Sequence, residues 1–219
     1  MLGACCTLRM PDNAAMIRPV RASDLAALHE ISLATGHVGA DAAGLYADPL
    51  MVGHIYSAPY GVLAPRLALV AEDAAGVAGF AVGAVDTAAW EALLERQWWP
   101  ALRQRYADPG QEVSPGWNAD QRRAFMFHHP AAVPEAVSAS HPAHLHLNLL
   151  PRLQRRGVGA ELLAAWLAVA RRHGARCVHV GVNRANTGAI GFWQTQGFRP
   201  LDAPPGRTLY LGRDIGPDE

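Results

Sequence analysis

Apolar and polar positions alternate along the chain with two different periods. Short apolar or alternating runs, typical of β-strands, occur at residues 17–20, 67–71, 77–85, 143–150, 177–182, 198–201 and 208–211. Apolar stripes at helical spacing predict helices between Ser23 and Gly36, between Asp48 and Pro59, and over 87–107, 159–173 and 186–196. The strand–helix–strand order over residues 143–182 indicates a right-handed parallel crossover. The pattern therefore predicts an α/β or α+β fold with a mixed sheet flanked by helices.

The same pattern indicates one domain with an insertion. Residues 1–15 have no clear period and are interpreted as an N-terminal extension, whereas 16–213 form the domain and 214–219 a short tail. The insertion spans about 87–142. Pro100 should kink or split its first helix, and residues 108–142, with five prolines and no sustained period, are expected to be a long loop or lid.

Composition narrows the functional classes. The chain of 219 residues is 50% hydrophobic, has a formal net charge of zero and contains no lysine, so nothing in its overall charge favours nucleic acid or an anionic membrane. No apolar run is long enough to span a bilayer, and no secretory signal is evident. The three cysteines form neither a disulfide framework nor a zinc spacing, so we expect a cytoplasmic protein.

The chemically most informative segment is residues 151–160, Pro-Arg-Leu-Gln-Arg-Arg-Gly-Val-Gly-Ala, between a predicted strand and a predicted helix. A glycine loop at a helix start directs main-chain N–H groups, with the positive end of the helix behind them, at a diphosphate. Two alternatives stay open. One is an ordinary strand–helix connection, and the other is a nucleotide-binding loop, for which the common phosphate-binding lysine is lacking.

Two motifs together resemble one protein family. The spacing Gln154-x-x-Gly157-x-Gly159 is similar to the acetyl-CoA pyrophosphate loop of the GCN5-related N-acetyltransferase (GNAT) superfamily. Downstream, the run over residues 181–198, with Asn186, Ala-Ile-Gly-Phe-Trp and a final Gly-Phe, resembles the stretch after the fifth strand of that family. The resemblance implies a mostly antiparallel sheet with one parallel pair and an insertion between the third and fourth strands. It also implies an acetyl-CoA cofactor and direct attack by a primary amine in a ternary complex.

The N-terminal half suggests a narrower similarity. Residues 48–60 and 141–151 resemble bacterial relatives of the acetyltransferase-like domain of O-GlcNAc hydrolase. The resemblance does not reach the sugar-hydrolysing domain, so hydrolysis is not implied. The acceptor stays open between a small-molecule amine and a protein lysine. Because relatives often dimerise, a homodimer is also an expectation.

The resemblance and the loop chemistry assign cofactor-binding residues. The amides of the loop would hold the pyrophosphate, with glycines where a Cβ would block the approach. Main-chain groups at the end of the preceding strand would pair with the pantetheine arm as an added strand does. Asn186 would hydrogen-bond this arm, a role compatible with being a helix N-cap, and Phe192 would pack near it. The predicted cofactor-binding residues are Leu149, Leu150, Gln154, Arg155, Arg156, Gly157, Val158, Gly159, Ala160, Asn186 and Phe192.

The predicted catalytic residues lie on the strand before the loop. Alternation places His144, His146 and Asn148 on one face and the intervening leucines on the other. Either histidine could serve as base, with a pKa near the working pH, while Asn148 could orient the amine. The alternative is a structural role for the histidines. A His144–His146 metal site lacks a third ligand, so no metal is predicted.

Two departures from the family pattern bear on catalysis. Trp193 stands where many members have a tyrosine that protonates the leaving thiolate, and an indole cannot do so. Asn148 stands where related bacterial sequences favour aspartate. An acyl-CoA-binding or sensing module with weak or no activity is therefore the alternative to an N-acetyltransferase.

Overall fold

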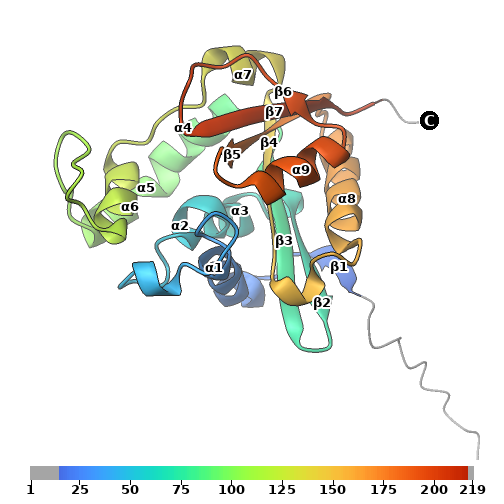
Figure 1. Ribbon diagram of the computed structural model, residues 1–219, viewed down its shortest axis with the longest axis horizontal. Coiled ribbons are helices and arrows are strands. Elements are labelled where there is room, and N and C mark those ends of the chain that lie inside the picture. The colour runs from blue at the N-terminus through green and yellow to red at the C-terminus, as the bar shows by residue number, and fades with distance from the viewer. Residues whose placement is uncertain (1–14, 217–219) are drawn as a thin grey trace, which may run out of the picture.

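The computed structural model of the chain describes residues 15–216. Their centre is a seven-stranded sheet in the order β1-β2-β3-β4-β5-β7-β6 (Figure 1). Neighbouring strands are antiparallel except for β4 and β5, which confirms the predicted mixed sheet. The strands are β1 (Met16–Pro19), β2 (Ala68–Asp73), β3 (Gly76–Ala84), β4 (Ala143–Leu149), β5 (Cys177–Asn183), β6 (Arg199–Pro200) and β7 (Thr208–Asp214).

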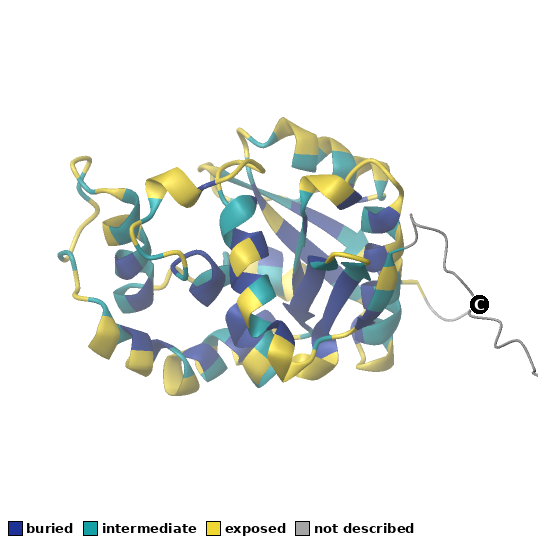
Figure 2. Cartoon of the chain, turned by 90° about the horizontal axis from the view of Figure 1, so that it is seen from below, coloured by how far each residue is buried: buried dark blue, intermediate teal, exposed yellow. Residues whose placement is uncertain are grey.

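Helices cover both faces of the sheet, and each face has its own apolar cluster. One cluster joins α8 and α9 to the sheet, and the other joins α1 to α6 to the opposite face. Figure 2 shows the buried residues gathered on the strands and on the inner sides of the helices. The helices are α1 (Leu25–Ala34), α2 (Gly53–Tyr56), α3 (Ala58–Leu63), α4 (Thr87–Gln97), α5 (Trp99–Arg105), α6 (Ala119–His128), α7 (Glu135–Ser140), α8 (Val158–Arg172) and α9 (Thr187–Thr195).

Helix α8 is fastened to the sheet by an apolar stripe. Its buried side chains follow helical spacing, and burying each large one stabilises the fold by about 1.5–3 kcal/mol. Trp166 is fully buried, and its indole N–H donates to the carbonyl of Leu67 at 2.9 Å, so the polar atom of this ring is also satisfied. Helix α8 is therefore held firmly against the sheet.

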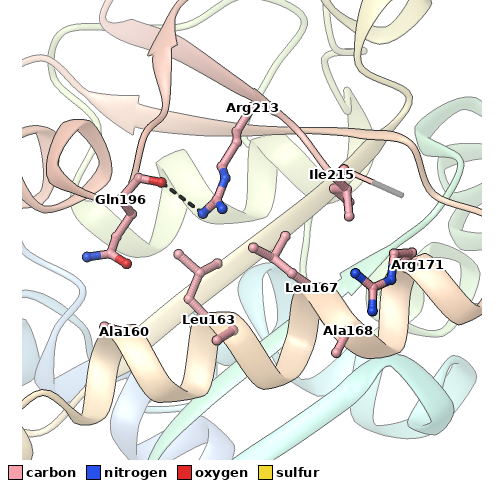
Figure 3. A pocket seen from close by; sticks show the side chains of 10 residues that line it. Ala160, Leu163, Leu167, Ala168, Arg171, Gln196, Arg213 and Ile215 are labelled. Atoms are coloured by element: carbon pink, nitrogen blue, oxygen red, sulfur yellow. Dashed lines mark hydrogen bonds between the residues drawn. The ribbon is translucent and has the colours of Figure 1, made fainter. Parts of the chain in front are cut away.

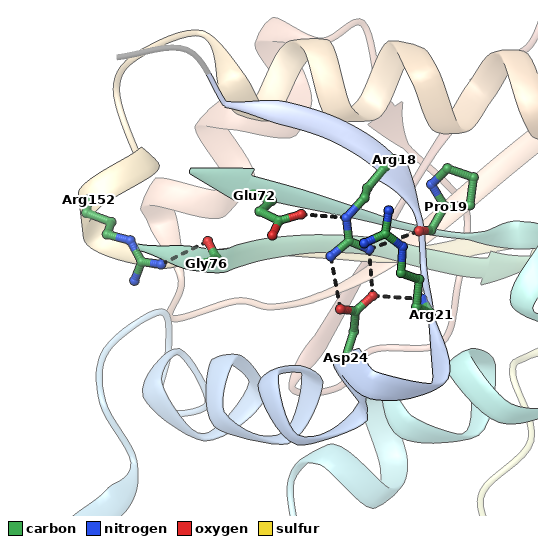
Figure 4. A network of polar contacts seen from close by, with 7 residues as sticks. All are labelled: Arg18, Pro19, Arg21, Asp24, Glu72, Gly76 and Arg152. Carbon is green, nitrogen blue, oxygen red and sulfur yellow. Dashed lines mark hydrogen bonds and ion pairs between the residues drawn. The ribbon is translucent and has the colours of Figure 1, made fainter. Parts of the chain in front are cut away.

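A buried ion-pair network fastens β1 to the start of α1 (Figure 4). The guanidinium of Arg18 donates two hydrogen bonds to Asp24, at 2.7 and 3.0 Å, and a third to Glu72 of β2. The hydrogen bond from Arg18 lowers the pKa of Asp24, which also accepts the main-chain N–H of Arg21. The carboxylate of Glu72 therefore has a structural role, as a partner of Arg18.

The insertion is more ordered than its composition predicts. The expected split near Pro100 is confirmed, because α4 ends at Gln97 and α5 begins at Trp99. The prediction of a long loop over 108–142 is wrong, because α6 and α7 lie within it. A capping box starts α6: Asn118 and Gln121 exchange side-chain-to-main-chain hydrogen bonds at 2.8 and 2.9 Å.

Two further predicted boundaries differ from the structure. The helix expected between Asp48 and Pro59 is two short helices that break at Ser57, and Pro59 occupies the first turn of α3 rather than ending a helix. The predicted tail starts too early, because Asp214 belongs to β7 and the N–H of Ile215 donates to Arg176 at 2.6 Å. The predicted extension, except for Ala15, lies outside the described residues. No helix within 15–216 has the length and apolar character needed to cross a membrane.

Candidate active site

The parallel strands β4 and β5 pair over only a short distance. In the described chain their register joins Ala143 to Val178 and His144 to His179, yet β4 continues to Leu149 and β5 to Asn183. Beyond His144 the two strands therefore diverge. An opening of this kind exposes main-chain groups of β4 that a regular sheet would use, and an extended ligand can pair with them.

The ladder with β3 decides which groups of β4 face this opening. The N–H of Leu150 donates to the carbonyl of Ala78 at 2.7 Å, so Leu150 faces β3. Hydrogen-bonded pairs alternate along an antiparallel ladder, and the main-chain groups of Leu147 and Leu149 therefore point toward β5. The prediction that Leu150 lends main-chain groups to the pantetheine arm is wrong, because its N–H donates to Ala78 and its carbonyl accepts from Leu153 at 3.0 Å. The main-chain groups of Leu147 face the opening instead.

Gln154 closes the carboxyl end of β4. Its side-chain amide donates to the carbonyl of Leu149 at 2.8 Å. The carbonyl of Leu149 is thus occupied by the protein itself, and only its N–H faces the opening. This contact gives Gln154 a role in shaping the loop, which differs from the predicted direct contact with a cofactor.

The loop between β4 and α8 presents a run of main-chain donors. A 3-10 turn over Pro151–Leu153 leads into Arg155 and Gly157, which both have left-handed backbones with φ of 59° and 83°. Gly157 is the N-cap of α8 and receives no side-chain cap. Among the described residues, none accepts a hydrogen bond from the N–H groups of Arg156, Gly157, Val158 or Gly159. These donors stand at the positive end of a 15-residue helix, as an anion site requires.

The two glycines of the loop are required for different physical reasons. Gly157 needs its positive φ, and a Cβ there would meet only the carboxylate of Glu161, at 3.9 Å. A Cβ on Gly159 would lie 3.3 Å from the ring of Phe192 and 3.4 Å from Leu149. Gly159 therefore lets α8, α9 and β4 approach one another. Three predicted cofactor-binding residues, Leu149, Gly159 and Phe192, therefore lie close together.

The three loop arginines are not equivalent. Arg152 donates to Asp73 at 2.8 Å and is held at the β2–β3 turn, where Figure 4 shows it beside Gly76. Arg156 donates to the carbonyl of Arg152 at 2.8 Å and is exposed, as is Arg155. Only Arg155 and Arg156 are therefore available to add charge near the loop. Ala160 donates its N–H back to Gly157 at 2.9 Å, so its amide is already used.

Asn186 caps α9. Its side-chain oxygen accepts the N–H of Ala189 at 3.0 Å, which confirms the N-cap interpretation. Its amide nitrogen lies against Gly39, where an added Cβ would come within 3.4 Å. The role of Asn186 toward the pantetheine arm stays a prediction.

His144 has a structural role. Its two ring nitrogens lie 2.8 Å from the hydroxyls of Tyr60 and Thr87, and the side chain is buried. Burial lowers the pKa of His144 well below its usual value. The expectation that this residue serves as a base with a pKa near neutrality is therefore wrong, because both nitrogens are engaged and protonation is disfavoured.

His146 keeps the geometry that a base needs. It is half-buried, and no described residue hydrogen-bonds its ring nitrogens. Its ring lies edge-on to Tyr56 and Tyr60, with centroids 5.4 and 5.6 Å away. Burial lowers the pKa of His146 to about 4, so the expected value near the working pH is corrected and the imidazole is neutral at physiological pH.

Asn148 is oriented by the end of α1. Its amide nitrogen donates to the hydroxyl of Thr35 at 2.6 Å, and that hydroxyl donates to the carbonyl of Ile31 at 2.7 Å. The hydroxyl has one proton, so the direction of both hydrogen bonds is determined. The side-chain oxygen of Asn148 is left without a partner among the described residues. His146 and Asn148 therefore present one neutral base and one acceptor on the same face of β4.

Comparison with known proteins identifies the family. A family model described as the acetyltransferase (GNAT) family matches residues 63–198. The chain belongs to the GNAT acetyltransferase family. As a member of this family, the protein is an N-acetyltransferase with acetyl-CoA as its cofactor.

Solved structures agree with this assignment. The structure of SsHAT is 35% identical, covers 93% of this chain and 100% of its own, and has a TM-score of 0.85. PaiA N-acetyltransferase from Thermoplasma acidophilum, in complex with coenzyme A, is 15% identical, with coverages of 92% and 99% and a TM-score of 0.54. A phosphinothricin acetyltransferase from Sinorhizobium meliloti, in complex with AcCoA, is 16% identical, with coverages of 92% and 89% and a TM-score of 0.53. The last two show the fold alone. The narrower similarity to O-GlcNAc hydrolase relatives stays a prediction.

Trp193 of this GNAT protein is a core residue. It is 5% exposed, and its ring contacts Phe192 and Phe198 at centroid distances of 5.1 and 4.9 Å. The indole therefore stabilises the attachment of α9 and takes no part in proton transfer. Among the described residues, no three His, Cys, Asp or Glu side chains gather in a way that could hold a metal.

A separate groove lies between α8 and the end of β7 (Figure 3). Leu163 and Leu167 form its floor, with Gln196 and Arg213 opposite, where Arg213 donates to the carbonyl of Gln196 at 2.9 Å. It meets the donor loop only at Ala160. The groove has no residue suited to proton transfer and is distinct from the site on β4.

The structure adds site residues that the sequence did not indicate. Thr35 bonds to Asn148, Tyr56 lies edge-on to His146, and Arg123 donates to Tyr56. The main chain of Leu147 faces the opening, and no local motif marks any of these four residues. Thr35 lies 113 residues from Asn148 and Arg123 lies 67 from Tyr56. Their only signal is tertiary contact.

Proposed function

We propose that this GNAT protein transfers the acetyl group of acetyl-CoA to a primary amine by direct attack in a ternary complex. The observation that supports this most is the run of unpartnered main-chain donors from Arg156 to Gly159, placed beside the opening between β4 and β5. A diphosphate fits such donors, and an extended amide-bearing arm fits the exposed main chain of β4.

The chain's own residues would hold the cofactor as follows. Acetyl-CoA supplies an acetyl group activated as a thioester. The amides of Gly157, Val158 and Gly159 would bind the phosphates, with Arg155 and Arg156 adding charge. Leu147 and Leu149 would offer main-chain groups to the arm, and Phe192 would pack beside it. Gly159 keeps this region close-packed without a side chain in the way.

His146 and Asn148 would handle the amine. A lysine-like amine has a pKa of about 10.4 and must lose a proton before it attacks. The neutral imidazole of His146 can accept that proton, and the free oxygen of Asn148 can accept a hydrogen bond from the same nitrogen. Because the pKa of His146 is about 4, the histidine is a weak base. Positioning the amine therefore provides most of the rate.

The test is release of free CoA from acetyl-CoA in the presence of a panel of primary amines. We expect turnover above the enzyme-free control, and a loss of cofactor affinity of about tenfold or more in Arg156→Glu. The matched control is Arg172→Glu at the exposed far end of α8, which should keep the wild-type affinity. Tight acetyl-CoA binding with no turnover on any amine would favour a sensing module instead. That alternative is consistent with the absence of a phenol at Trp193.

A further inference from the structure

A guanidinium without a carboxylate partner stands next to the proposed amine site. Arg123 of α6 donates from Nε to the hydroxyl of Tyr46 at 2.9 Å and from Nη1 to the hydroxyl of Tyr56 at 3.1 Å. It also lies over both tyrosine rings, 6.0 and 5.3 Å from their centroids. Within residues 15–216 no carboxylate lies within ion-pair distance of it.

The neighbouring arginines of the insertion behave differently. Arg103 is bound by both oxygens of Glu95, and Arg105 is paired with Asp48 at 3.1 Å. Asp120, one turn before Arg123 on α6, directs its two oxygens to the main-chain N–H groups of Ala47 and Asp48, at 3.0 and 3.2 Å. The protein thus supplies carboxylates to two nearby arginines and directs a third carboxylate elsewhere, while Arg123 has only neutral partners.

Tyr56 connects this cation to the chemistry. Its hydroxyl accepts from Arg123, while its ring lies edge-on to His146 with centroids 5.4 Å apart. Arg123 and His146 are therefore separated by one tyrosine side chain. Arg123 is half-buried, so its charge is partly desolvated but can be reached from solvent. Nη1 also donates to the sulfur of Met126 at 3.2 Å, whereas the Nη2 donors have no partner among the described residues. Nη2 can therefore donate to a carboxylate oxygen while Nε and Nη1 stay bound to the tyrosines.

The side chains around the proposed amine position on β4 are neutral. His146, Asn148, Thr35 and Tyr60 carry no negative charge that would attract a second cationic group on the acceptor. A polyamine or a lysine-rich peptide would place extra positive charge next to Arg123 and would be repelled. An amine that also carries a carboxylate would satisfy both ends of the site.

We infer that the acceptor of this protein is a small amine bearing a carboxylate, and that Arg123 binds the carboxylate while His146 and Asn148 receive the amine. The inference rests on the proposed function for the identity of the reacting end. It adds the chemical class of the acceptor, a zwitterionic amino acid, and assigns Arg123 as the specificity-determining residue.

The test compares acceptors that differ only in the carboxylate. Glycine, β-alanine, 4-aminobutanoate and 5-aminopentanoate are each matched with the unbranched alkylamine of the same carbon number. We expect kcat/KM for the best acid to exceed that for its matched amine by about tenfold or more, through KM. Arg123→Met should abolish this difference between each acid and its matched alkylamine. Arg122→Met on the exposed side of α6 is the control and should keep the preference.

A binding measurement separates this inference from the proposed function. If no amine is turned over, saturation-transfer NMR of 5-aminopentanoate against pentylamine still reports which one binds, and competition by free phosphate reports whether the site accepts any anion. Turnover or binding that is equal for acid and matched alkylamine in the wild type overturns the inference while leaving acetyl transfer intact. Circular dichroism and the melting temperature establish that Arg123→Met is folded, and Arg123→Lys, which keeps the charge, should retain part of the preference.

Discussion

The amide nitrogen of Asn148 lies 2.6 Å from the hydroxyl of Thr35, so the middle of the sheet is joined to the last turn of α1 at the proposed amine site. Thr35 gives its own proton to Ile31 and can only accept from Asn148. This directs the side-chain oxygen of Asn148 away from α1. The orientation of Asn148 is therefore a consequence of where α1 ends.

Thr35→Val should disturb this orientation. The valine has the same shape but no hydroxyl, so Asn148 loses its acceptor and the fold loses about 1–2 kcal/mol. We expect kcat/KM for the amine to fall about tenfold, with acetyl-CoA affinity unchanged. Thr35→Ser, which keeps the hydroxyl, is the control and should stay within about threefold of wild type. Equal kinetics for the two variants would remove Thr35 as a positioning residue.

His146→Gln should lower the rate without changing cofactor affinity. The pKa of His146 is about 4, so its imidazole stays neutral from pH 5 to 9 and cannot shape the pH–rate profile there. We expect the rate of the wild-type enzyme to rise with pH as the free amine fraction rises, and the variant to show the same rise at a lower level. Rates measured between pH 5.5 and 9 test this. A break near pH 6.5 that vanishes in the variant would contradict the lowered pKa that keeps this imidazole neutral.

His144→Ala is expected to act on stability. It removes a buried ring and leaves the hydroxyls of Tyr60 and Thr87 without the partner that each has at 2.8 Å. The cost should be about 2–4 kcal/mol in the free energy of unfolding, measured by urea denaturation. The pH–rate profile of the folded variant should keep its shape. A changed profile would return His144 to the catalytic candidates.

The burial of His54 predicts how the free energy of unfolding depends on pH. This side chain is buried against Trp98, Tyr106 and Phe127, neither ring nitrogen has a partner among the described residues, and burial lowers its pKa to about 4. Unfolded histidine titrates near 6.5. Between these pH values the unfolded chain binds more protons at His54 than the folded chain does. His54 therefore has no effect on the free energy of unfolding above about pH 6.5 and lowers it as the pH falls toward 4.

The slope attributable to one such histidine is about 1.4 kcal/mol per pH unit inside that window. His54→Phe should reduce the overall slope by that amount and lose less than about 1 kcal/mol at pH 7.5, because it keeps the ring contacts. Urea denaturation at pH 7.5, 6.0 and 5.0 checks both values. An unchanged slope in His54→Phe would show that His54 is not the group that titrates.

The sequence predicts the elements whose signals are local. Strands β2 to β5 and helix α8 have bounds within about two residues of the expected ones, because apolar period and flanking glycines mark their ends. The start of α6 also had a local signal in Asn118 and Gln121, which the surrounding prolines and polar residues obscured. Ser57 carries no such signal, so the break between α2 and α3 was not predictable.

The site is only partly visible in the sequence for a related reason. Alternation on β4 correctly placed His144, His146 and Asn148 on one face, but it could not say that Tyr60 and Thr87 occupy both nitrogens of His144. Burial then lowers the pKa of both histidines, which depends on packing between distant segments. The main-chain groups of Leu147, and not those of Leu150, face the opening, because the register with β3 is set by the whole sheet.

The central claim is that the amides at the front of α8 bind the phosphates of coenzyme A. The direct measurement is a titration of ¹⁵N-labelled protein with coenzyme A, with phosphate-free pantetheine as control. We predict large amide shifts at Gly157, Val158 and Gly159 with coenzyme A and none there with pantetheine, whose shifts should appear at Leu147 and Leu149. Binding of coenzyme A that leaves Gly157 to Gly159 unmoved, or no binding at millimolar concentration, would contradict the claim.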